Sequence, residues 1–165
     1  MMAALQTVRL YESADEEAVW EIIRQVLAGG EAYVFYPDSS RDKMLSYWLA
    51  KDKKVFVVLS GETIVGTFTI KPNMPDRASH IANASYMTHP AHEGKGIGLF
   101  MANYSLEEAK RLGYTAMQFN IVIKSNERAV RLWKKVGFEI IGEIPDAFNH
   151  PRLGMTNAYV MYRKL

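Results

Sequence analysis

The stretch THPAHEGKGIGLF, Thr88 to Phe100, decides how the chain is interpreted, because it puts three glycines within five residues directly before an apolar run. The segment HIANASYMTHP (80–90) before it has the pattern of a strand, and GLFMANYSLEEAKRLG (98–113) has the pattern of a helix. A glycine-rich turn at the start of a helix exposes backbone N–H groups, and the helix N-terminus adds partial positive charge there. The sequence therefore predicts a site for an anion at residues 93–98.

Two well-known phosphate loops do not fit this stretch. A P-loop needs Ser or Thr after Gly-Lys, but Gly94-Lys95 is followed by Gly96. A dinucleotide fingerprint that starts at Gly94 or Gly96 needs a further glycine, at Leu99 or Met101. Backbone amides that hold a diphosphate remain as one interpretation, and a tight strand-to-helix corner without a ligand is the other.

Composition limits the classes of protein that need to be considered. The chain has 165 residues, of which 48% are hydrophobic, so we expect a single domain over residues 1–165. A net charge of +2 argues against a nucleic-acid-binding domain, and the lack of cysteine excludes disulfides, thiolate metal sites and a cysteine nucleophile. We expect no metal site. The opening MMAALQTVRL is unlike a signal peptide, and no long apolar run predicts a membrane span or a membrane partner, so a cytoplasmic location is expected.

The remaining segments predict alternating helices and strands around the glycine stretch. A helix is expected after Ser13 as its N-cap, followed by a second helix, RDKMLSYWLAKD (41–52). Two strands then meet in a hairpin at residues 60–62, and the segment PDAFNHPRLG (145–154) is expected to form a loop between the last two strands.

The strand expected at TAMQFNIVI (115–123) carries two amide side chains. Its odd positions, up to Ile121 and Ile123, are apolar and share one surface of the sheet. Gln118 and Asn120 fall on the opposite surface because side chains alternate along a strand. The sequence therefore predicts a polar patch on one face of the sheet, close to the glycine stretch.

Two motifs in the chain resemble those of the GNAT superfamily of N-acetyltransferases. The first has the form P-x-x-(R/Q)-G-x-G-x-G and the second N-x-x-A-x-x-L-(Y/W)-x-x-x-G-F, about thirty residues further on. The matching residues are Pro90, Gly94, Gly96 and Gly98, then Asn126, Ala129, Leu132, Trp133, Gly137 and Phe138. The resemblance covers nearly the whole chain. It implies an α/β fold with a mixed, mostly antiparallel sheet of about six to seven strands, splayed at the acetyl-CoA site and flanked by about four helices.

The resemblance also implies acetyl-CoA as the cofactor and names the residues that would hold it. In the family, the strand before the glycines splays from its parallel neighbour at a bulge, and its main chain pairs with the pantetheine arm. The implied cofactor-binding residues are Met87, Thr88, Glu93, Gly94, Lys95, Gly96, Ile97, Gly98 and Asn126. Glu93 departs from the family pattern, which has arginine or glutamine, and we expect it to point to solvent or to pair with a cation such as Lys95.

The implied catalytic residues depart from the family pattern as well. Trp133 stands where the family often has a tyrosine that protonates the leaving thiolate, and an indole N–H can donate a hydrogen bond but does not titrate. Tyr104, Tyr159 and water are the alternatives for this acid. The usual glutamate base is replaced by Asn83 and Ser85, so that proton removal through ordered water is our first expectation and His80 our second.

A narrower resemblance concerns the acceptor. The segments HIANASYM and FNIVIKSNERAVRLWKKVGFEIIGEI are similar to the branch with the fungal acetyltransferases that act on proline analogues such as azetidine-2-carboxylate. In that branch an asparagine lies at the reaction centre, and Asn120 matches it. The regions around residues 32–48 and 145–154 would wall the acceptor pocket with Tyr33, Phe35, Tyr36 and Phe148, and Arg41, Arg77 or Arg152 would receive a substrate carboxylate.

These observations predict an acetyl-CoA-dependent N-acetyltransferase acting on the amine of a small molecule, with an amino or imino acid as one acceptor class. Two other functions stay open at this point: a catalytically silent acyl-CoA-binding module and a protein N-acetyltransferase. The expected partner is the small-molecule substrate, without nucleic acid or membrane, and the resemblance implies that two copies could pair through their final strands.

Overall fold

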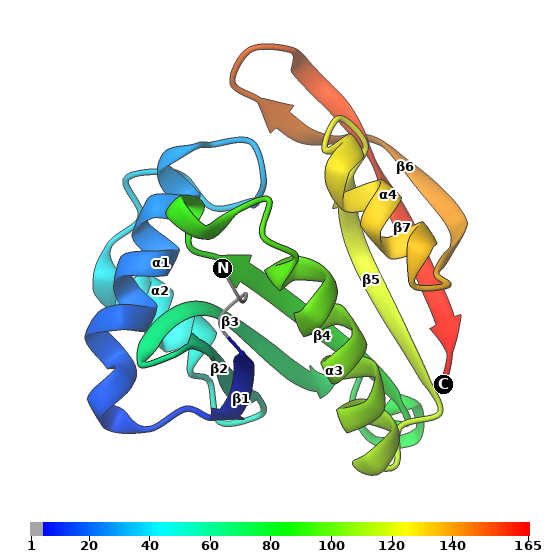
Figure 1. Cartoon of the computed structure of the whole chain (residues 1–165). Coiled ribbons are helices and arrows are strands. Elements are labelled where there is room, and N and C mark those ends of the chain that lie inside the picture. The colour runs from blue at the N-terminus through cyan, green and yellow to red at the C-terminus, as the bar shows by residue number, and fades with distance from the viewer. Residues whose placement is uncertain (1–4) are drawn as a thin grey trace.

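One seven-stranded sheet organises the protein, whose computed structural model describes residues 5–165 (Figure 1). The strand order is β1-β2-β3-β4-β5-β7-β6, and every neighbouring pair is antiparallel except β4 and β5. This arrangement confirms the predicted mixed, mostly antiparallel sheet. The strands are β1 (Gln6–Leu10), β2 (Lys54–Ser60), β3 (Thr63–Pro72), β4 (Ile81–Thr88), β5 (Ala116–Ile123), β6 (Glu139–His150) and β7 (Gly154–Lys164).

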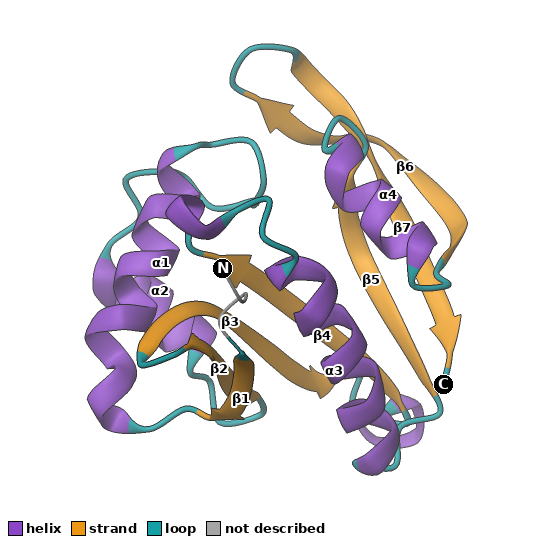
Figure 2. Cartoon of the chain, viewed as in Figure 1, coloured by secondary structure: helices purple, strands orange, loops and turns teal. Residues whose placement is uncertain are grey.

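Four α-helices cover the two faces of the sheet (Figure 2). Helices α1 (Glu16–Ala28) and α2 (Arg41–Trp48) pack on one face against Val55, Val57 and Met87. Helices α3 (Ile97–Arg111) and α4 (Glu127–Lys135) pack on the other face, where the core includes Phe68 and Phe119. None of the helices within residues 5–165 is long and apolar enough to cross a membrane. Residues 1–4, which belong to the expected domain and to the opening segment discussed above, lie outside the described residues.

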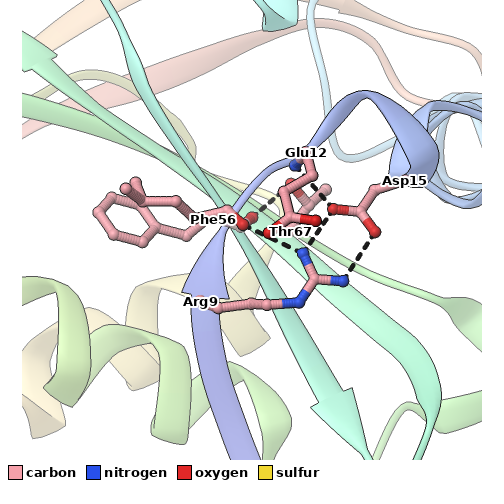
Figure 3. A network of polar contacts seen from close by, with 6 residues as sticks. Arg9, Glu12, Asp15, Phe56 and Thr67 are labelled. Carbon is pink, nitrogen blue, oxygen red and sulfur yellow. Dashed lines mark hydrogen bonds and ion pairs between the residues drawn. The ribbon is translucent and has the colours of Figure 1, made fainter.

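The start of the first helix differs from the prediction. Ser13 is the first residue of a 3-10 turn, Ser13–Asp15, and α1 begins only at Glu16. Asp15 ends this turn and accepts hydrogen bonds from the Glu12 amide, at 2.8 Å, and from both terminal nitrogens of Arg9, at 2.7 and 2.8 Å (Figure 3). The bonds from Arg9 lower the pKa of the Asp15 carboxyl, which is almost fully buried. An ion pair between β1 and this turn therefore replaces the serine cap that the sequence predicted.

The expected loop at 145–154 is for the most part a strand. β6 continues to His150, and only Pro151–Leu153 form the turn to β7. The pairing of β6 with β7 shifts between Ile144 and Phe148, and Asp146 adopts a φ of 49° in this irregular part. β6 is an edge strand, and an edge with a bulge accepts a proline such as Pro145 because its N–H needs no partner there. The turn residues in this segment therefore mark a bulge and not the end of the strand.

The alternation expected in β5 stops at its centre. The register of β5 against β7 shifts between Phe119 and Val122, so that Asn120 and Ile121 together oppose one residue of β7. Ile121 is exposed, contrary to its predicted position in the core, while Val122 and Ile123 are buried. The bulge thus lies in β5, whereas β4 keeps an unbroken register with β3 from Ala82 to Thr88.

Candidate active site

The sheet opens between β4 and β5. These parallel strands pair only at Ile81 with Ala116 and at Ala82 with Met117, and beyond this point they diverge, as Figure 1 shows. A cleft of about 1000 Å³ follows the split and reaches both faces of the sheet. It is lined by the ends of β4 and β5, the glycine stretch, the start of α4 and the loop after α1. The predicted splaying of the sheet is therefore present.

The glycine stretch presents bare backbone to this cleft. Gly94 and Gly96 have φ values of 74° and 80°, which favour glycine, and no atom lies within 4 Å of the position where a Cβ would be. Within residues 5–165, the amide groups of Gly94 to Leu99 donate to no other group. Gly96 precedes α3 directly, so these amides and the positive end of the helix lie together. Gly98 is helical, and a Cβ on it would touch Leu132 of α4 at 3.5 Å.

Glu93 pairs with a cation that the sequence did not point to. Its carboxylate accepts a hydrogen bond from Nη1 of Arg128 on α4 at 2.8 Å. Lys95, the expected partner, donates instead to the carbonyl oxygen of Ala91 at 3.3 Å. Because Arg128 balances the charge of Glu93, the carboxylate does not leave a net negative charge at the mouth of the cleft.

The free edge of β4 already holds a hydroxyl group. Tyr33, from the loop after α1, donates from its hydroxyl to the carbonyl oxygen of Tyr86 at 2.6 Å and accepts from the amide of Tyr86 at 3.0 Å. Main-chain groups alternate in direction along a strand, so those of Thr88 face the cleft with Tyr86, whereas those of Met87 face β3. Of the two main-chain positions predicted to meet the pantetheine arm, the backbone of Thr88 is the accessible one. Burial raises the pKa of the Tyr33 hydroxyl, which stays protonated.

Three amide side chains, those of Gln118, Asn120 and Asn73, form a connected row, and the Asn83 side chain joins it through the main chain of Gln118. Asn83 donates to the main-chain oxygen of Gln118 at 3.0 Å, and Gln118 donates to Oδ1 of Asn120 at 3.0 Å. Asn120 in turn donates to Oδ1 of Asn73 at 2.8 Å. Asn83 and Asn120 both line the cleft. The amide groups predicted on one surface thus meet across the split between β4 and β5.

The comparisons with known proteins agree with this geometry. The chain matches the acetyltransferase (GNAT) family over residues 15–138. It belongs to the GNAT family. A solved GCN5-related N-acetyltransferase from Kribbella flavida is 34% identical with a TM-score of 0.91, over 97% of this chain and 98% of the other.

Two curated relatives differ in how much of their length they share with the chain. N-acetyltransferase aca1 of Schizosaccharomyces pombe is 42% identical over 85 residues, which are 52% of this chain and 41% of the relative. The L-methionine sulfoximine/L-methionine sulfone acetyltransferase of Salmonella typhimurium is 27% identical over 144 residues, 84% of this chain and 83% of the relative. The chain therefore spans less than half of the first relative and most of the second.

GNAT acetyltransferases use acetyl-CoA, and the residues of the cleft fit this molecule. Bare amides at the start of α3 suit a diphosphate, and the free edge of β4 suits an extended amide chain. The Ser125 hydroxyl, on the cleft wall, is buried without a hydrogen-bond partner within residues 5–165. Asn126, the predicted contact, uses its side-chain oxygen to cap α4, accepting from the Ala129 amide at 3.2 Å. Ser125 and Asn126 are therefore neighbouring polar residues on the cleft wall, and only Asn126 was expected from the sequence to contact the cofactor.

The predicted acid and base residues lie in different environments. Trp133 lines the cleft but is 9% exposed and packs against Phe119, with 4.6 Å between ring centroids. Tyr104 packs against Phe56 and Phe68, and neither Tyr104 nor Tyr159 lines the cleft. His80 is exposed before β4 and also lies outside the cleft lining.

The residues expected to wall the acceptor pocket are also divided. Tyr33 and Phe35 line the cleft, while Tyr36 is 74% exposed and Phe148 is buried in contact with His150. Arg41 pairs with Glu16 and Glu17 of α1, and Arg77 lies on a 3-10 turn away from the cleft. Among the three arginines expected to receive a substrate carboxylate, Arg152 is the one that contacts a residue of the cleft, because its Nε donates to Glu31 at 2.6 Å. No group of His, Asp and Glu side chains within residues 5–165 is arranged to hold a metal ion.

Proposed function

We propose that the chain transfers the acetyl group of acetyl-CoA to the amine of a small molecule, and that amino or imino acids, proline analogues among them, are the acceptor class. One observation carries the proposal: the cleft joins the bare amides of Gly94 to Leu99 to the side chains of Asn83 and Asn120 at the split between β4 and β5. An anion site for the cofactor and a polar site for an amine thus share one cavity.

Asn120 and Asn83 are assigned to the reacting groups. Attack by a neutral amine on the thioester needs an acceptor for the amine N–H and a donor for the oxyanion that forms. Gln118 occupies one acceptor site on the Asn120 side-chain oxygen, and Asn73 accepts one of the two amide N–H groups of Asn120. One acceptor site and one N–H therefore stay free for the substrate. The amine proton passes to water, because β4 offers Asn83 and Ser85 in place of a carboxylate. Trp133 donates its indole N–H toward the leaving sulfur without transferring the proton, so the departing thiolate takes its proton from water. His80, which lies outside the cleft lining, takes no part.

Two observations support a small acceptor. The loop after α1 and the turn between β6 and β7 contact each other through Glu31 and Arg152, so one side-chain contact bridges the acceptor end of the cleft. A relative that aligns with 84% of this chain is a methionine sulfoximine and methionine sulfone acetyltransferase, which acts on amino-acid derivatives. The resemblance to the proline-analogue branch points to the same class.

A binding and turnover experiment tests the proposal. Acetyl-CoA should raise the melting temperature of the protein, and the release of free thiol should then be measured with amino acids, imino acids, polyamines, aminoglycosides and peptides. We expect thiol release with amino or imino acids. Release with none of these acceptors would contradict the proposed function.

The second candidate is a catalytically silent acyl-CoA-binding module. The lack of a carboxylate among the cleft-facing side chains of β4, Asn83 and Ser85, favours this candidate, because a strong general base is missing there. This candidate predicts a shift in melting temperature with acetyl-CoA and no thiol release with any acceptor. A protein N-acetyltransferase would instead release thiol with peptides alone. The absence of nucleic-acid and membrane partners, the pairing of two copies and the cytoplasmic location stay predictions.

A further inference from the structure

Three side chains join the two halves of the split sheet above the acceptor end of the cleft. Glu31, in the loop after α1, accepts a hydrogen bond from Nε of Arg152 at 2.6 Å, and its other oxygen lies 3.8 Å from Nε2 of His150. The two chain segments also come close at the same place, because a Cβ on Gly30 would lie 3.7 Å from the side-chain ring of Pro151. Glu31 and His150 line the cleft. We call these residues, Glu31, His150 and Arg152, the clasp.

The His150 ring is held with Nε2 toward the carboxylate of Glu31. Its side chain is 3% exposed, and Nδ1 accepts hydrogen bonds from the amides of Arg152 and Leu153, both at 3.1 Å. A nitrogen that accepts from two amides carries no proton, so the proton of the neutral ring is on Nε2. At 3.8 Å the Glu31 oxygen is too far for a hydrogen bond, and Nε2 has no hydrogen-bond partner within residues 5–165. The ring therefore offers a free donor directed at a carboxylate.

We propose that Arg152 and His150 form the subsite for the carboxylate of an amino-acid or imino-acid acceptor, and that Glu31 occupies this subsite until the acceptor binds. The inference rests on the proposed function and specifies its substrate class. A guanidinium and an imidazole N–H that converge on one carboxylate are the groups that recognise an α-carboxylate. Glu31 acts here as an internal carboxylate.

The exposure of the ion pair makes an exchange feasible. The side chain of Arg152 is 70% exposed and that of Glu31 is 41% exposed, and ion pairs in such positions contribute little to stability. Glu31 can therefore turn to solvent while Arg152 and the buried His150 keep their places. The hydrogen bond from Arg152 lowers the pKa of Glu31, so the residue that has to leave is ionised at neutral pH.

Binding of matched ligands tests the subsite without any need for turnover. With coenzyme A present, calorimetry should compare L-methionine sulfone with its decarboxylated amine, and azetidine-2-carboxylate with azetidine. For Arg152→Gln we expect affinity for the two acids to fall about tenfold, while the two amines change less than about twofold. His150→Asn keeps an oxygen to accept the two amides but lacks the Nε2 donor, and it should weaken the acids by about threefold to fivefold. Glu31→Gln should strengthen them, because it removes the internal competitor.

The control is Arg24→Gln. Arg24 also forms an exposed ion pair, with Glu21 at 2.7 Å, but lies on α1 away from the cleft lining, and we expect no change in the binding of any ligand. The inference is overturned if the acids bind no better than the amines, if they do not bind, or if Arg152→Gln leaves them unchanged. Thiol release is read separately. If the acids bind through Arg152 but release no thiol, the subsite is supported and the acyl transfer is contradicted. If the decarboxylated amines are acetylated as well as the acids, the acyl transfer is supported and the subsite is contradicted.

Discussion

The cofactor side and the acceptor side of the cleft are built in different ways. On the cofactor side, the groups offered to a ligand are main-chain amides within the short segment Gly94–Leu99, and two glycines with positive φ create the geometry. On the acceptor side they are side chains from the loop after α1, from β4, from β5 and from the turn after β6. Local backbone geometry can be encoded by a few neighbouring residues, whereas a group of side chains from distant segments depends on the packing of the whole sheet. Changes on the two sides should therefore affect cofactor binding and turnover separately.

The largest effect is expected from Gly96→Val. A valine at a φ of 80° is strained, and its side chain would screen the amides from a diphosphate. We expect affinity for acetyl-CoA, measured by calorimetry, to fall by about a hundredfold or more. The matched control is Gly61→Val in the β2–β3 hairpin, where φ is 62° and space is also open, so it should cost similar stability and leave binding intact. Normal binding by Gly96→Val would refute the assignment of the cofactor side.

The next effect is expected from Asn120→Ala on the acceptor side. Loss of a donor or acceptor at the reacting groups should lower kcat by about thirtyfold to a hundredfold, while the Kd for acetyl-CoA changes little. Steady-state thiol release and calorimetry measure the two quantities. Asn103→Ala, at an exposed position on α3, serves as the control. If Asn120→Ala weakened acetyl-CoA as much as turnover, the two sides would not be separable.

A smaller effect is expected from Tyr33→Phe, because Tyr33 lies where the cofactor side and the acceptor side of the cleft meet. The Tyr33 hydroxyl binds the amide and the carbonyl oxygen of Tyr86, the edge that an extended cofactor arm would use. Its removal should strengthen acetyl-CoA binding by about threefold to fivefold, in line with the usual contribution of one hydrogen bond. Tyr36→Phe in the same loop changes an exposed hydroxyl and should have no effect. Weaker binding by Tyr33→Phe would mean that the hydroxyl supports the cofactor site and does not compete for it.

The smallest effect is expected from Glu93→Gln. The change releases Arg128 from its exposed ion pair, and the free guanidinium can then approach a diphosphate. We expect acetyl-CoA binding to strengthen by about twofold at low salt and to be unchanged at high salt, because salt screens exposed charges. A titration at two ionic strengths measures this. Weaker binding at low salt would show that Glu93 itself supports the site.

The backbone geometry of the glycine stretch could be predicted from the sequence because its determinants are local. Glycines at 94 and 96 and the start of a helix define a main-chain geometry that needs no other segment. The fold class and the splayed strands were implied by the resemblance to the GNAT superfamily, which two motifs carry. The local predictions that were wrong, the Ser13 cap and the loop at 145–154, concern places where a contact from another strand replaced the local preference.

The acceptor side could be predicted only in part. The two amides of β5 were expected on one surface, and they lie there. The bulge at Asn120 and Ile121 was not expected, because it depends on the register with β7 and not on the residues themselves. His150 had no distinguishing signal in the sequence, since it lay within an expected loop.

The sequence by itself determined the glycine-rich corner before α3, the order of strands and helices, and the family to which the chain belongs. Only the tertiary structure decided that Glu93 pairs with Arg128, that Ser125 is buried beside the cleft, and that Glu31 meets Arg152. The physical reason is the separation along the chain: backbone conformation depends on the nearest residues, but a pair of side chains meets only after the sheet has brought their segments together.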